Sequence, residues 1–184
     1  SLILLLEEIS LCFSNSSKML DSLHNKCLDI YKSYLCIGGM PQAVEDYINK
    51  EQNLMSFNRD IHSNIITAYI ADMRKYVISA EESIKIQSIY ESIPKQLGND
   101  NKKFKYSNVS KNSNKRQYEL PLDWLLASNM IVKCKKIKVP EMPLSIYEEE
   151  DNFKIYLSDV GLLNYLANVN FSDIMLDGNF LFKG

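Results

Sequence analysis

The residues with the clearest chemical potential are basic side chains concentrated in the middle of the chain. Between Lys95 and Tyr118, seven lysines and arginines stand against a single acidic residue, Asp100. Such an excess of positive charge attracts phosphate groups, so it predicts contact with a nucleic acid. A solvated basic loop without a ligand is the alternative interpretation of the same charges. The side chains that we expect to contact nucleic acid are Lys102, Lys103, Lys105, Lys111, Lys115 and Arg116.

Residue types that serve catalysis or metal binding are few and scattered. The chain has two histidines, His24 and His62, and four cysteines without the paired spacing of a zinc site or a redox motif. No phosphate-binding loop of the form Gly-x-x-x-x-Gly-Lys-Ser/Thr occurs. The sequence therefore predicts no catalytic residue, no metal site and no cofactor in this chain. The cysteines, which we expect to be buried free thiols in a reducing cytosol, are Cys12, Cys27, Cys36 and Cys134.

The formal net charge of −2 hides a division of charge along the chain. Residues 95–140 carry 11 basic and 3 acidic side chains, whereas residues 141–184 carry 2 and 8. The basic segment predicts an anionic partner, for which double-stranded DNA is the first candidate. The apolar run Leu2–Leu6 is too short to span a bilayer and lacks the flanks of a signal peptide. We therefore expect a cytoplasmic protein without membrane contact.

Helices must supply the scaffold that positions the basic segment. The strongest helical stripe of apolar residues runs from Ile86 to Leu97 after an N-cap at Ser79, and Pro94 is expected to bend this helix or end it near Ile93. Asn114 begins the helix that follows the basic loop, with glutamine three residues later in a capping-box position. Further helices are expected over residues 2–13, 20–35, 41–47, 54–76 and 160–169, with a short last one beginning near residue 172.

A β-hairpin is expected after the basic helix. Met130–Val139 alternates lysines with smaller residues, and Phe153–Leu157 has the pattern of its antiparallel partner, with an acidic loop before it. The predicted fold class is mainly α with a small antiparallel β-hairpin. We expect a helical, lid-like bundle over residues 1–77 and a winged-helix-like domain over residues 78–184. In that domain the basic loop and helix would approach phosphates, as in known DNA-binding motifs.

Several short motifs, in one order along the chain, resemble a known family. They include Tyr34–Pro41, which contains a Gly-Gly-Met-Pro run, then Arg59-Asp60-Ile61, Asp72–Tyr76, Ser92–Leu97, Asn101–Ser107, Arg116–Glu119, Pro143-Leu144, Phe153–Leu163 and Leu181–Gly184. On these residues the chain resembles the prokaryotic AAA-like ATP-binding proteins that carry a C-terminal domain of unknown function. The likeness extends over nearly the whole chain. Pro121 departs from the good helix formers usual in that family and puts the straightness of its helix in question.

The resemblance implies an organisation that this chain represents only in part. In that family an ATPase core, which binds ATP and Mg²⁺, precedes the matching region, and a nuclease-like domain follows it. The ATP and Mg²⁺ would therefore belong to the parent protein and not to this segment. The apolar ends of the chain, from Ser1 and at Phe180–Phe182, also led us to expect a piece of a larger protein.

Two functions remain open for such a segment. In the first, a helical lid and a winged-helix module contact nucleic acid on behalf of the ATPase. In the second, the segment is a structural connector or protein-interaction module that couples the ATPase core to the C-terminal domain of the same chain. The residues expected to make inter-domain contacts in that case are Arg59, Asp72 and Arg74. A self-sufficient hydrolase is disfavoured because no nucleophile stands beside a general base.

Overall fold

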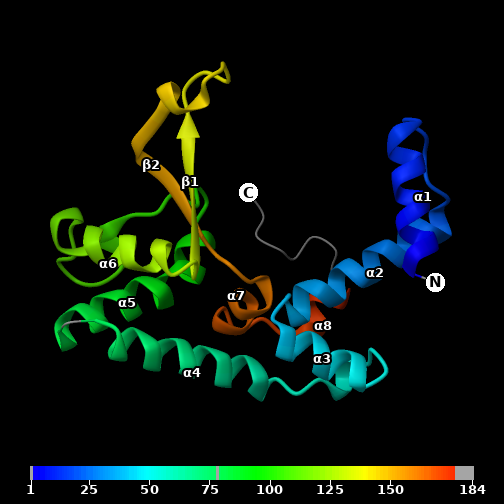
Figure 1. Ribbon diagram of the computed structural model, residues 1–184, viewed down its shortest axis with the longest axis horizontal. Coiled ribbons are helices and arrows are strands. Elements are labelled where there is room, and N and C mark those ends of the chain that lie inside the picture. Colours follow the sequence, from blue (N-terminus) through cyan, green and yellow to red (C-terminus); the bar gives the residue numbers. More distant parts are fainter. Residues whose placement is uncertain (1, 78, 177–184) are drawn as a thin grey trace.

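A computed structural model describes residues 2–77 and 79–176 and shows a mainly helical chain with one small antiparallel sheet. The predicted fold class is confirmed. The molecule is long, and its two ends each carry a protrusion on the same side: α1 at one end and the hairpin at the other (Figure 1). The elements are α1 Leu2–Ser14, α2 Asp21–Ile37, α3 Pro41–Asn49, α4 Asp60–Lys75, α5 Ala80–Leu97, α6 Lys115–Ala127, β1 Ile131–Ile137, β2 Glu148–Leu157, α7 Val160–Leu166 and α8 Phe171–Leu176.

The N-caps of the two central helices are those that the sequence indicates. The Ser79 hydroxyl accepts a hydrogen bond from the Glu82 N–H at the start of α5, and the Asn114 side chain accepts one from the Gln117 N–H at the start of α6. The expected end of α5 near Ile93 is wrong, since the helix continues to Leu97. Pro94 lies in the last turn of α5 and is buried. Proline has no backbone N–H, so the helix lacks one hydrogen bond there, while the proline ring packs in the interior.

The helix expected over residues 54–76 is shorter than predicted. A 3₁₀ turn occupies Leu54–Ser56, and α4 begins only at Asp60. Asn58 separates the two, because its side chain accepts the Asp60 N–H while its own N–H donates to Asp46. These local hydrogen bonds compete with a continuous helix, as asparagine side chains commonly do.

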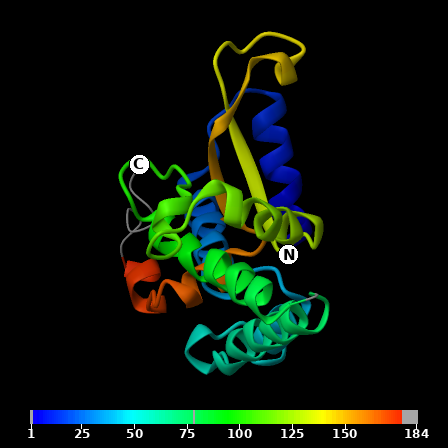
Figure 2. The same cartoon turned by 90° about the vertical axis from the view of Figure 1, so that its left-hand side faces the viewer.

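The two strands of the hairpin pair antiparallel, as predicted. Ile131 lies opposite Leu157 and Lys135 opposite Phe153, and a bulge follows between Lys135 and Lys136. The Phe104 N–H donates to the carbonyl oxygen of Phe153 at 3.0 Å, so the basic loop runs alongside β2 at that point. Figure 2 shows the hairpin rising above α5 and α6, with α4 on the opposite side of them.

Two apolar clusters fill the interior. The first, which we call the hairpin core, packs α5 and α6 under the inward face of the hairpin, with Ile89 and Leu125 completely buried. The second, the α2 core, gathers around Cys36 at the end of α2 and includes Ile174 of α8. Met73 of α4 belongs to the hairpin core. Each core thus contains residues from both sides of position 77. The division into residues 1–77 and 78–184 stays a prediction.

The two cores meet where the end of α2 touches the start of α7. The Asp159 carboxylate accepts hydrogen bonds from the Gly39 N–H at 2.6 Å and from the Leu162 N–H at 2.9 Å. Gly38 has φ +75°, and a Cβ there would lie 2.2 Å from an Asp159 oxygen. A Cβ on Gly161 would lie 2.5 Å from the carbonyl oxygen of Ile37. Both glycines are therefore needed for this close approach, which we call the α2–α7 junction.

Two buried side chains satisfy the last carbonyls of α2 at this junction. The amide of Asn164 donates to the Leu35 oxygen at 2.8 Å, and Nε2 of His62 lies 2.9 Å from the Ile37 oxygen. Since a carbonyl can only accept, Nε2 of His62 carries the proton and Nδ1 is bare. Among the described residues, Nδ1 of His62 has no hydrogen-bond partner.

Gly161→Ala should lower the free energy of unfolding by about 2–4 kcal/mol, because the added methyl group meets backbone atoms that cannot move aside cheaply. Urea denaturation followed by circular dichroism measures the effect. Gly98→Ala is the matched control, since its nearest non-neighbour atom would be 3.5 Å away and its change should stay within about 0.5 kcal/mol. Equal effects of the two substitutions would contradict the close approach at Gly161.

Stability should fall as the pH drops below about 6.5, because burial lowers the pKa of His62 in the folded chain. The Ile37 hydrogen bond and Asp159 oppose this shift, and Arg59 adds to it. The unfolded chain binds the proton near pH 6.5 and the folded chain resists it. Stability is therefore complete above that pH and is lost below it, by up to about 1.4 kcal/mol per pH unit.

Urea denaturation at pH 7.5 and 5.5 would measure this dependence. His62→Gln keeps a donor for the Ile37 carbonyl but does not titrate, so it should flatten the dependence. His24→Gln, at an exposed position, should leave it unchanged. A wild-type stability that is the same at both pH values would contradict the assignment.

Candidate nucleic-acid interface

The basic segment forms an ordered loop between α5 and α6. Oε1 of Gln96, a residue only 2% exposed, accepts the Lys105 N–H at 2.7 Å and attaches the loop to α5. The Ser113 hydroxyl hydrogen-bonds the carbonyl oxygens of Tyr106 and Ser110 within the loop. The hydroxyls of Ser110 and Tyr118 lie 2.8 Å apart, and this hydrogen bond holds the far end of the loop against α6. The backbone that carries the lysines is therefore fixed by side-chain hydrogen bonds, and it can present charges in defined directions.

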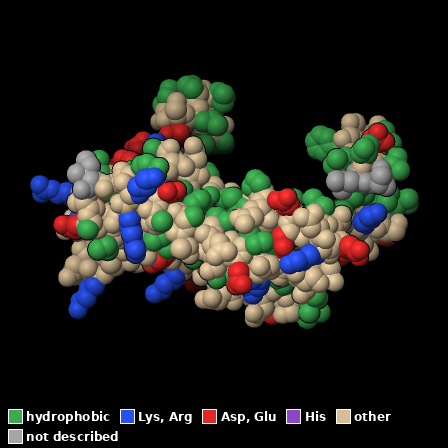
Figure 3. Space-filling view, turned by 60° about the horizontal axis from the view of Figure 1, so that its bottom comes forward, with side chains coloured by type: hydrophobic (Ala, Val, Ile, Leu, Met, Phe, Trp, Pro, Cys, Tyr) green, Lys and Arg blue, Asp and Glu red, His purple; other side chains and the backbone are tan. Residues whose placement is uncertain are grey.

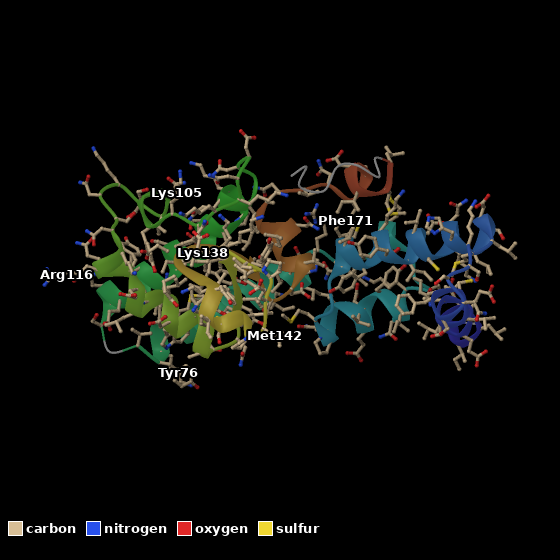
Figure 4. All side chains as sticks on the ribbon, turned by 90° about the horizontal axis from the view of Figure 1, so that it is seen from above. Tyr76, Lys105, Arg116, Lys138, Met142 and Phe171 are labelled. Atoms are coloured by element: carbon tan, nitrogen blue, oxygen red, sulfur yellow. The ribbon has the colours of Figure 1, made fainter. Side chains whose placement is uncertain are left out.

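The six cations predicted for nucleic-acid contact do not converge on one point. Lys102 and Lys103 are half-buried, whereas Lys105, Lys111, Lys115 and Arg116 are exposed. Figure 4 places Arg116 at the end of the molecule opposite α1 and Lys105 at a separate edge of the loop. The charges are spread along one end of the molecule, and a ligand that met all of them would need an extended anionic surface.

Acidic side chains of β2 compensate several lysines. Nζ of Lys115 lies 2.8 Å from Asp151, and this contact raises the pKa of Lys115 and lowers that of Asp151. On β1, Nζ of Lys135 lies 2.8 Å from Glu148 and 2.9 Å from Glu150. Lys136 pairs with Glu149 at 3.2 Å in the same way. Three lysines of the basic segment, Lys115, Lys135 and Lys136, are thus paired with acids of β2.

The exposed face of α6 is of mixed character. Arg116 at its first turn is followed by Glu119, by Leu120 with 74% exposure, and by Asp123. A helix that reads a nucleic acid normally offers cations and hydrogen-bond donors along the contact face. Past its first turn, α6 offers carboxylates and an apolar side chain instead.

The tip of the hairpin exposes several apolar side chains beside Lys138 and Glu141. Between β1 and β2 the chain passes through residues 138–147, which we call the hairpin tip. Met142 is 83% and Ile146 72% exposed there, and Val139 and Leu144 are also exposed. Hydrophobic side chains cover this protrusion and that of α1 in Figure 3. We did not single out these residues from the sequence, although the run of valine, methionine, leucine and isoleucine between two strands was a usable signal.

The three residues predicted to make inter-domain contacts lie apart. Arg59 is engaged within this chain: its guanidinium donates to the Val169 carbonyl at 3.1 Å and stands 4.9 Å from the ring centroid of Phe171. Asp72 and Arg74 are exposed near the end of α4. Arg59 therefore attaches the start of α4 to the segment between α7 and α8, and only the other two are accessible to a partner.

None of the helices in residues 2–77 and 79–176 is long and apolar enough to cross a membrane. In the same residues, no three histidine, cysteine or acidic side chains lie together as ligands for a metal ion.

The comparisons with known proteins give one match. A family model described as a domain of unknown function, DUF8612, matches residues 28–173, a stretch that includes most of α2, the basic loop, the hairpin and the α2–α7 junction. No curated protein and no solved structure matches the chain.

Proposed function

The chain belongs to the DUF8612 family, a domain of unknown function, and from that premise we propose that it is a connector that contacts other protein domains. The parent protein in this proposal is an AAA-like ATP-binding protein, as the resemblance of the motifs suggests. ATP and Mg²⁺ are bound by the parent's ATPase core. This segment carries no catalytic residue and links that core to a C-terminal domain.

The observation that carries the proposal is the chemistry of the hairpin. A wing that binds phosphates needs several uncompensated cations near its tip. Here Lys135 and Lys136 are paired with the acids of β2, and Lys138 is an exposed lysine of the tip with no ion pair among the described residues. The tip itself exposes Met142 and Ile146. Exposed apolar side chains gathered on a protrusion are characteristic of surfaces that other proteins cover.

The hairpin tip is also mechanically connected to the helices. At the base of the hairpin, Ile155 and Leu157 are buried in the hairpin core. β2 then continues within two residues into Asp159 and α7, which hold the end of α2. The tip is therefore joined through packed elements to the α2–α7 junction, and this continuity supports the connector proposal.

A photo-crosslinking amino acid at Met142 of the intact protein should form a crosslink to another domain of the same polypeptide, because a connector holds its apolar tip against that domain. Met55, which is 94% exposed on a different part of the molecule, is the matched control and should give no such crosslink. Mass spectrometry of the digested product identifies the partner segment. Crosslinks from position 142 to nucleic acid, or none at all, would contradict the proposal.

A second candidate, contact with double-stranded DNA, is favoured by the cations that stay uncompensated. Within residues 79–176, where the structure describes the chain, Lys105, Lys111 and Arg116 form no ion pair and are exposed. The order of a helix, a basic loop, a second helix and a hairpin also supports the winged-helix-like interpretation. Such contacts would be made to phosphates and would carry little sequence specificity.

If this second candidate is right, the triple variant Lys105→Glu, Lys111→Glu and Arg116→Glu should abolish binding to a short DNA duplex. Each lost phosphate contact should lower the slope of log affinity against log salt concentration by about 0.9. Asp151→Asn removes the partner of Lys115 and should raise the affinity. Fluorescence anisotropy over a salt titration measures both changes. A wild-type chain that does not bind even at low salt would eliminate this candidate.

A further inference from the structure

The helix α1 has an apolar surface that the described part of the chain leaves open. Leu5 is buried with 5% exposure, whereas Leu6 is 57%, Leu11 56% and Phe13 87% exposed. The charged side chains of this helix are both acidic, Glu7 and Glu8. A helix of 13 residues gains little stability from its backbone alone, so covering its apolar side chains is the main favourable contribution open to it.

A groove of complementary character lies between α2 and α3. It has a volume of about 480 Å³ and apolar walls that include Ile30 and Tyr34 of α2 and Val44 and Ile48 of α3. Among the residues that line it, all within the described part of the chain, Lys26 alone is charged. The groove thus suits an apolar helix that carries a carboxylate.

The helix α1 is such an apolar helix with carboxylates, yet it reaches the groove of its own chain with one residue only. It stands beside the first part of α2, at the end of the molecule away from the hairpin (Figure 1). Leu5 is its one residue that lines the groove. The apolar face of α1 and most of the groove therefore stay open in a single chain, although their chemistry matches.

We propose that two copies of this chain associate, with α1 of each copy lying in the groove between α2 and α3 of the other. Because each copy has one such helix and one such groove, a two-fold arrangement fills both grooves at once and closes the assembly at two copies. Glu7 and Glu8 of one copy then face Lys26 of the other. This inference uses other residues than the hairpin tip, so it stands or falls independently of the connector function.

Light scattering after size-exclusion chromatography, repeated over a range of protein concentrations, should show the mass of two chains. Leu6→Asp in α1 and Ile48→Asp in the groove should each weaken the association about 100-fold, because each places a carboxylate in an apolar contact. Ile84→Asp is the matched control, since Ile84 is 62% exposed on α5 and Ile48 59% exposed on α3. Its affinity should stay within about threefold of the wild type, a change of less than 1 kcal/mol. Circular dichroism verifies that each variant is folded.

A charge exchange tests the pairing between copies. Lys26→Glu in one chain, and Glu7→Lys with Glu8→Lys in another, should each weaken self-association about tenfold through like charges. An equal mixture should recover the wild-type affinity, because both contacts of the mixed pair then join opposite charges. Within each chain Lys26 also borders a hollow beside its own α1, and mixing leaves those charges unchanged. A recovered affinity in the mixture would therefore show that Lys26 of one chain lies near Glu7 and Glu8 of the other.

Three outcomes would overturn the inference. They are a wild-type chain of single mass at every concentration, a pair of chains that is insensitive to Leu6→Asp and Ile48→Asp, and a mixture of the two charge variants that associates no better than either alone. A wild-type chain of single mass would mean that the groove does not bind a second copy, and a helix of a different protein would then be the candidate ligand.

Discussion

The close approach of α2 and α7 is the constraint on which the rest of the molecule depends. One carboxylate, that of Asp159, accepts the N–H groups of Gly39 and Leu162, and so joins the end of one helix to the start of another. Hydrogen bonds to a charged acceptor are roughly twice as strong as neutral ones. The absence of side chains at Gly38 and Gly161 makes room for this contact. This contact joins the hairpin core to the α2 core, and α4 also spans the two, with Met73 in the first and Ile61 in the second.

The features that could be predicted from sequence are those with local causes. Ser79 and Asn114 are caps whose partners lie three residues away, and the hairpin strands follow from their alternation of residues. The pairing of Lys135 with Glu148 and Glu150 depends instead on the register beyond the bulge, which no local pattern specifies. Charge along a sequence is therefore a poor guide to charge on a surface once a hairpin folds one segment onto another.

The junction escaped prediction for a related reason. His62 and Asn164 act on the carbonyls of Ile37 and Leu35, far away in the sequence, and neither stands in a recognisable motif for that role. Both are buried polar groups, and Nδ1 of His62 and Oδ1 of Asn164 lack a partner among the described residues. Each of the two side chains satisfies a carbonyl oxygen at the end of α2, so an apolar replacement would leave that oxygen buried without a partner and destabilise the junction. The surfaces open to partners lie at the two ends of the molecule, and the junction keeps those ends at a fixed separation.

The junction also sets an order in time. Gly39 and Asp159 are 120 residues apart, and a ribosome that adds about 5–20 residues per second needs on the order of ten seconds to synthesise that interval. During this interval, His62 soon becomes available to the end of α2, whereas Asp159 and Asn164 do not yet exist. Contacts so distant in sequence also form slowly, because a long loop must close first. The end of α2 is therefore made well before the partners that complete it, and we expect it to become native late.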